Sequence, residues 1–183
     1  QLVSQYLSNT LPQGTNIISD VAFKLKSSTA VSLIIDILRV LAAPSDRLTR
    51  MSMAYKYYKH VCKHNEVTMH QFFTSDDDTI NQILPQEFIA NEQNLSISPL
   101  YELCEKIYSL FHLDSIDGQD AYLFSFFDQL AAFVHDKPAT INTFITYWDE
   151  NLHKESIPSA QTDGIQVITI HKSKGLEFHT IFI

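Results

Sequence analysis

The chain has 183 residues, and 21 acidic against 13 basic side chains give it a formal net charge of −8. Hydrophobic residues make up 45% and aromatic residues 11% of the sequence, which excludes a disordered or fibrous chain. The acidic balance argues against a freestanding nucleic-acid-binding domain, which would carry a basic face. It leaves open a local basic site on a larger protein. At about 150 residues per domain, we expect one or two domains.

Cysteine content and hydropathy restrict the cellular setting. Cys62 and Cys104 form no C-x-x-C pair, which indicates reduced thiols and a cytoplasmic protein rather than a disulfide framework. The most apolar run, residues 31–43, contains Asp36 and Arg39 and is too short to cross a bilayer of about 30 Å. The chain begins with glutamine and stops within an apolar run, so we expect it to be part of a longer polypeptide.

Helical patterns dominate the first 155 residues. Residues 16–19 predict a short strand, and Ser28 can cap a helix that runs to about residue 43, where Pro44 stops it. This helix is apolar around nearly its whole circumference, so it must be buried. A second helix begins at Ser45 or Asp46 and runs to about Lys63.

Four further helical segments follow. Residues 64–94 predict short helical pieces, separated by an acidic run at 76–78 and by Pro85. Ser98 and Pro99 form a predicted cap and first helical residue, followed by an apolar stripe to Phe111. Similar stripes predict a helix over about 119–135 and another, capped by Thr140, that includes Trp148 and Leu152.

The pattern changes after Pro158. A polar linker at 159–164 precedes a β-branched run at 165–170, and another such run occupies 179–183. Near-continuous apolar strands are typical of a sheet that is covered on both faces. We therefore predict a mainly α chain in which a helical subdomain, residues 47–160, is inserted between partial α/β pieces at 1–46 and 161–183.

The segment between the last two strands carries the most chemistry. It reads T-I-H-K-S-K-G-L-E-F over residues 169–178, and ligands bind at the carboxyl ends of strands in open α/β sheets. Lysine, serine and backbone N–H groups suit a phosphate oxygen of a nucleotide or of a nucleic-acid backbone. Gly175 permits close backbone approach, and Glu177 can accept hydrogen bonds from sugar hydroxyls.

This segment resembles the fifth conserved motif of superfamily-one DNA helicases of the UvrD, Rep and RecB/AddA kind. Seven matching positions recur by chance in on the order of one in a billion windows. The resemblance implies that residues 1–46 and 161–183 belong to the second, RecA-like (P-loop NTPase) motor lobe. It also implies roles for individual residues: Thr169, His171, Ser173 and Lys174 would contact DNA, and Gly175 and Glu177 would lie toward ATP, with Glu177 on the ribose.

The implied parent protein is an ATP-dependent DNA helicase or translocase that uses ATP and Mg²⁺ and acts in DNA repair or recombination. The helices that contain Tyr122-Leu123-Phe124 and residues 144–148 resemble the AddA/RecB branch, which implies an exonuclease activity and an AddB/RecC-like partner subunit. Two alternatives stay open: a UvrD-like repair helicase without a nuclease, and a helical protein-interaction module. No glycine precedes Lys-Ser or Lys-Thr, so the P-loop is missing and we expect this chain alone not to hydrolyse ATP.

Other residues invite weaker hypotheses. His60 and His64, four residues apart on the predicted helix, suggest zinc, but Cys62 points elsewhere and no fourth ligand is near in sequence, so we predict no metal site. The acidic run at 76–78 better fits a solvated turn or a helix start than a cation site. The aromatic residues could stack on bases, yet their helical spacing among aliphatic residues favours core packing; these are Tyr55, Tyr57, Tyr58, Phe124, Phe126, Phe127, Phe133 and Trp148. Ser173 with His171 lacks an acidic residue to orient a catalytic pair.

Overall fold

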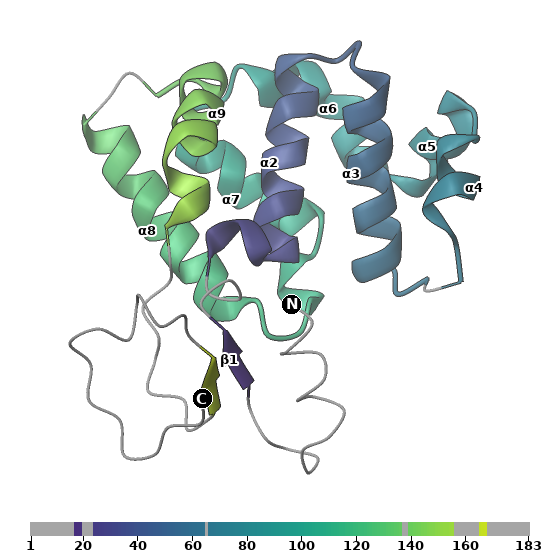
Figure 1. The fold of residues 1–183 in the computed structure, drawn as a ribbon. Helices are drawn as coiled ribbons and strands as arrows, with labels where there is room; N and C mark the ends of the chain where they lie inside the picture. The colour runs from purple at the N-terminus through teal and green to yellow at the C-terminus, as the bar shows by residue number, and fades with distance from the viewer. Residues whose placement is uncertain (1–16, 20–23, 65, 137–138, 156–164, 168–183) are drawn as a thin grey trace, which may run out of the picture.

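A computed structural model describes residues 17–19, 24–64, 66–136, 139–155 and 165–167. Over these ranges the protein is mainly helical, as the sequence predicts. Figure 1 shows the helices gathered into one group, with two short strands beyond one end of it. We call the group, residues 24–64, 66–136 and 139–155, the helical unit. None of its helices is long and apolar enough to cross a membrane.

The described elements follow the predicted order closely. They are β1 (Ile17–Ser19), the 3-10 turn η1 (Leu25–Ser27), α2 (Thr29–Ala42), α3 (Arg47–His60), α4 (Met69–Phe73), α5 (Asp77–Ile83), α6 (Gln86–Ser96), α7 (Leu100–Leu110), η2 (Leu113–Ser115), α8 (Asp120–Asp136), α9 (Ile141–Glu150), η3 (Leu152–Lys154) and β2 (Ile165–Val167).

Helix α2 lies at the centre of the helical unit (Figure 1). Ten of its fourteen residues are buried, because it packs against α3, α6, α7, α8 and α9. This confirms the prediction that an all-round apolar helix is buried on most sides. Each fully buried leucine or isoleucine contributes about 1.5–3 kcal/mol relative to an exposed one, so α2 supplies a large share of the hydrophobic core.

Helices α2 and α3 form an antiparallel pair, joined by a short loop that contains Pro44. The predicted caps are present at both starts: the side chain of Ser28 accepts from the Val31 N–H at 3.1 Å, and that of Asp46 from the Thr49 N–H at 3.2 Å. Across the pair, Lys56 Nζ donates to Ser32 Oγ at 2.7 Å. The last turn of α3 therefore lies at the same end of the unit as the first turn of α2.

One predicted cap is wrong. Ser98 does not cap α7, because Pro99 occupies the N-cap position and no side chain caps this end. The Ser98 hydroxyl donates instead to the Asn94 carbonyl at 3.0 Å, one turn back toward α6. A serine that follows a helix closely can satisfy its hydroxyl on the preceding carbonyls, and the local sequence does not distinguish the two arrangements.

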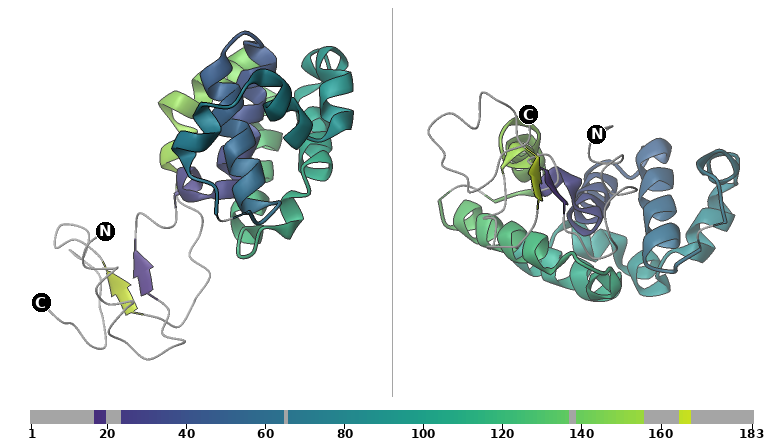
Figure 2. Two further views of the ribbon diagram at one scale, coloured as in Figure 1. Left: turned by 90° about the vertical axis from the view of Figure 1, so that its right-hand side faces the viewer. Right: turned by 60° about the horizontal axis from the view of Figure 1, so that its bottom comes forward.

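Strands β1 and β2 pair in parallel, with Ile17 opposite Ile165 and Ser19 opposite Val167. Both were predicted as strands, and their pairing joins segments that almost the whole helical unit separates in sequence. Figure 2 shows the pair beyond the end of the unit where η1 lies. The predicted strand at 179–183 lies outside the described residues. The predicted limits between residues 46 and 47 and between 160 and 161 stay predictions.

Candidate functional site

The parallel pair β1–β2 is the described feature that comes nearest in sequence to the predicted site. In a parallel pair the carboxyl ends of both strands lie at one edge, which is where ligands bind in open α/β sheets. The sequence continues from the carboxyl end of β2, at Val167, into the segment 169–178. The six predicted site residues lie outside the described part of the chain: Thr169, His171, Ser173, Lys174, Gly175 and Glu177.

The two ends of the helical unit are held together where the chain leaves for the strands. The Leu25 N–H donates to the Glu155 carbonyl at 3.0 Å, and η1 packs against η3. The start of α2 is also tied to the residue before α8: the Ser28 hydroxyl donates to Gln119 Oε1 at 2.6 Å. Two chain segments that leave one point of a folded unit can both enter a single sheet. The geometry is therefore that of a helical insertion between two strands.

The metal hypothesis at His60 and His64 started from a wrong premise. Helix α3 ends at His60, and His64 lies beyond Lys63, whose φ of 59° is left-handed, so the two histidines do not share a helical face. The His64 ring stacks on Tyr58 instead, with centroids 4.2 Å apart. Among the described residues, no three His, Cys, Asp or Glu side chains form a group that could hold a metal ion.

The acidic run at 76–78 starts a helix, as predicted. The side chain of Asp76 accepts from the Thr79 N–H at 2.7 Å, and Asp77 pairs with Arg47 at 2.7 Å. The hydrogen bonds from Thr79 are the main cause of a lowered pKa at Asp76. Asp76 and Asp77 therefore already bind protein groups at the start of α5.

Most of the predicted aromatic core is confirmed. Phe126 is fully buried and meets Phe144 and Trp148 edge to face. The remaining aromatic residues of the predicted stripe are buried or pack against this core. Phe124 is the exception: it is 74% exposed, because it lies on the opposite side of α8 from Leu123, Phe126 and Leu130.

The pKa shifts of Cys104, Tyr57 and His60 are caused mainly by burial and do not indicate a catalytic role. Burial raises the pKa of the Cys104 thiol to about 12, so this residue acts as a small apolar side chain. Burial, helped by neighbouring Cys62, raises the pKa of Tyr57 to about 12. Desolvation is also the main cause of a lowered pKa at His60, with Lys59 and Lys56 adding to it.

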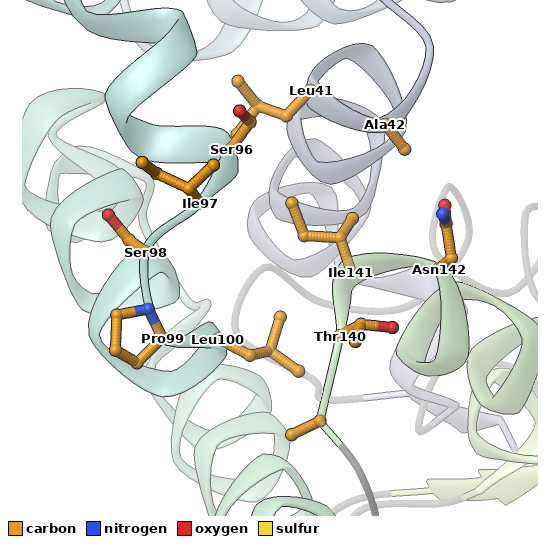
Figure 3. Close-up of a pocket in the computed structure, with 11 residues that line it drawn as sticks. Leu41, Ala42, Ser96, Ile97, Ser98, Pro99, Leu100, Thr140, Ile141 and Asn142 are labelled. Atoms are coloured by element: carbon orange, nitrogen blue, oxygen red, sulfur yellow. The ribbon is translucent and has the colours of Figure 1, made fainter.

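One pocket of the helical unit is remote from β1 and β2. It has a volume of about 540 Å³ and lies between the end of α2, the junction of α6 with α7, and the start of α9 (Figure 3). Since α2 has fourteen residues, this is about 20 Å from the end that faces β1. Its lining contains no acid, base or thiol, so it offers no catalytic group.

Comparison with known proteins bears on the last third of the chain. Residues 121–183 match the model of the UvrD-like helicase C-terminal domain family, a range that takes in α9, β2, most of α8 and the whole segment 169–178. No curated protein and no solved structure gave a match. The family match suggests an ATP-dependent helicase and supports a fragment of UvrD/Rep-like type; it does not single out the AddA/RecB branch.

Proposed function

We propose that this chain is part of the second motor lobe of an ATP-dependent DNA helicase or translocase of the UvrD type. The observation that carries the proposal is the family match over residues 121–183, which includes the whole segment 169–178. The parallel pairing of β1 with β2 supports it, since the helical unit then interrupts a sheet that the lobe would share.

The three-part organisation from the sequence is retained in this proposal, with one change. We place the start of the helical insertion near Lys24 rather than Arg47, because α2 supplies nine buried residues to the hydrophobic core of the helical unit. The flanking residues, which include β1 and β2, would belong to the RecA-like lobe.

The residues of the segment 169–178 suit two ligands at once. Thr169, His171, Ser173 and Lys174 offer hydroxyl, imidazole and ammonium donors for DNA phosphates. Gly175 would let the backbone approach the nucleotide, and Glu177 would accept hydrogen bonds from the ribose of ATP bound with Mg²⁺. One segment that contacts both ligands can couple closure around ATP to the grip on single-stranded DNA.

Hydrolysis itself needs groups that this sequence does not contain. Phosphoryl transfer requires a P-loop, Mg²⁺ ligands and an arginine that stabilises the transferring phosphate, and no glycine here precedes Lys-Ser or Lys-Thr. We propose that other parts of the same polypeptide supply them. A nuclease activity, an AddB/RecC-like partner and a repair or recombination role belong to the AddA/RecB hypothesis, which a nuclease assay on the intact protein would test.

The test is ATP hydrolysis by the intact protein, measured with and without single-stranded DNA. His171→Ala should reduce DNA stimulation, and Glu177→Ala should raise the KM for ATP, each by about 10-fold or more, because a hydrogen bond to a charged group contributes about 1.5–3 kcal/mol. The control is His135→Ala, since the His135 side chain is 88% exposed on α8 and is assigned no role. Wild-type kinetics in both test variants, or no stimulation in the wild type, would contradict the proposal.

A further inference from the structure

Helix α3 and the turn after it form the most basic stretch of the helical unit. Residues 47–64 contain five lysines and arginines and no acidic residue, in a chain of net charge −8. The first three are paired with carboxylates: Arg47 with Asp77, Arg50 with Glu92 and Lys56 with Asp36. Lys59 and Lys63 have no carboxylate partner among the described residues, although the exposed Glu66 follows nearby in sequence. The positive charge is thus concentrated at the end of α3.

An aromatic stack of Tyr58 and His64 lies at the same end of α3, while the Lys59 ammonium lies over the Tyr55 ring, 5.6 Å from its centroid. The rings of Tyr58 and His64 are 4.2 Å apart and inclined by only 14°. The His64 N–H donates back to the Tyr58 carbonyl at 3.2 Å, and Tyr58 also packs against Phe72, a buried core residue. The stack is therefore fixed to the core on its Tyr58 side, while His64 on its outer side is exposed.

The backbone at Lys63 gives an independent observation. Its φ is 59°, and among the described non-glycine residues only His112 shares a positive φ. Glycine is the usual residue in such a left-handed position after a helix, because a side chain there is strained. A lysine in this position therefore keeps a basic residue directly before His64 in sequence at the expense of backbone strain. Strained positions of this kind are enriched at functional sites.

We propose that Tyr58, Lys59, Lys63 and His64, which we call the α3-end surface, bind single-stranded DNA. The two ammonium groups contact successive phosphates, and the outer face of the His64 ring stacks on an unpaired base. Positive groups beside an aromatic platform are the features by which proteins hold single strands without sequence preference. Duplex DNA fits less well, since its bases are already stacked on one another. The proposal rests on the proposed function, which supplies the DNA.

The position of the α3-end surface fits this assignment. Because α3 runs antiparallel to α2, the surface lies at the end of the helical unit from which η1 leads to β1 (Figure 1). Lys24, which precedes η1, and Lys26 within it also have no carboxylate partner in the described structure. Acidic residues also lie at this end: Asp114, Asp117 and Asp120 in the stretch from η2 to the start of α8, and Glu155 beside Leu25. They would disfavour a DNA strand beside them and leave it on the α3 side.

The test is fluorescence anisotropy of the intact protein with three labelled probes of equal length: oligothymidylate, an abasic single strand and a duplex. Lys63→Gly removes the ammonium group while relieving the left-handed strain, so loss of folding would not explain a change. We expect it to weaken oligothymidylate binding about 3- to 10-fold and to lower the magnitude of the salt slope by about 0.7. His64→Ala should weaken oligothymidylate binding about 5-fold or more, because a stacked base contributes about 1–3 kcal/mol, and should leave the abasic strand unchanged.

The matched control is Lys106→Ala, which removes one exposed and unpaired lysine from α7. It should bind all three probes as the wild type does. Wild-type affinity in both Lys63→Gly and His64→Ala would overturn the proposal. It would also be overturned if His64→Ala lost as much affinity for the abasic strand as for oligothymidylate. The same holds if Lys63→Gly lost as much affinity for the duplex as for single strands. If the wild-type protein shows DNA-stimulated ATP hydrolysis but the variants bind DNA as it does, only the α3-end surface is refuted. If the variants weaken DNA binding but the wild-type protein hydrolyses no ATP, the proposed function is refuted instead.

Discussion

Replacing Lys56 with methionine should destabilise the protein more than the loss of a surface ion pair would. The side chain of Asp36 is only 9% exposed and that of Lys56 28% exposed, with Nζ and Oδ2 2.6 Å apart. Lys56→Met leaves the carboxylate two weaker partners, the Ser52 hydroxyl at 3.4 Å and Arg39 Nη1 at 3.9 Å. Breaking a fully buried pair costs about 3–5 kcal/mol, while an exposed pair contributes about 0–1 kcal/mol. Because this pair is partly solvated, we expect a loss of about 2–3 kcal/mol.

Urea unfolding measures this loss directly. Trp148 is the single tryptophan of the chain and is 5% exposed, so its fluorescence reports unfolding of the core. Lys56→Met should lower the midpoint with an unchanged m value. The double variant Asp36→Leu/Lys56→Met should recover most of the stability, because two apolar side chains remove the uncompensated charge. A cost below about 1 kcal/mol for Lys56→Met, or a double variant no more stable than the single one, would refute the reasoning.

Three further predictions test the packing and the titration of the helical unit. Phe126→Ala should lower the free energy of unfolding in urea by about 3–5 kcal/mol, since it opens a cavity in the core. Phe124→Ala, on the exposed side of the same helix, should lower it by less than about 0.5 kcal/mol. Similar losses for the two variants would contradict the assigned packing. Ser28→Ala should cost about 1–2 kcal/mol, because it removes both the cap of α2 and the hydrogen bond to Gln119, and a lack of change in thermal unfolding would count against this role. The pKa of His60 is lowered in the folded state, so the unfolded state binds more protons. Stability should therefore fall as the pH drops below the ordinary pKa of 6.5 and through the folded pKa. Unfolding curves at several pH values should show a smaller dependence of stability on pH for His60→Gln.

Helix starts could be predicted where a side chain does what its position suggests. Ser28, Asp46 and Thr140 each accept from a backbone N–H three residues on, and this interaction depends on local sequence only. Ser98 shows the limit, because its hydroxyl can bond backward as well as forward and the sequence does not decide between them. Phe124 shows another, since a run of aromatic residues on one helix continues past the buried face.

Long-range features are harder to predict from the sequence. The sequence predicts β1 and β2 as strands, but their parallel pairing across the helical unit depends on how the whole unit closes at Leu25 and Glu155. The charge at the end of α3 was missed for a similar reason: which of its basic side chains are neutralised depends on carboxylates that other helices bring to it. The signal that could have found it is the absence of any acidic residue over 47–64. The motif roles at 169–178 rest on sequence alone and stay predictions.

The central claim is that one segment of this chain joins ATP binding to the grip on DNA. The most direct test is the affinity of the intact protein for a non-hydrolysable ATP analogue, measured with and without saturating single-stranded DNA. Linkage requires that each ligand change the affinity for the other by the same factor, typically about 5- to 150-fold. We predict a reciprocal change of that size, which Glu177→Ala abolishes. Equal analogue affinity with and without DNA in the wild-type protein would contradict the account.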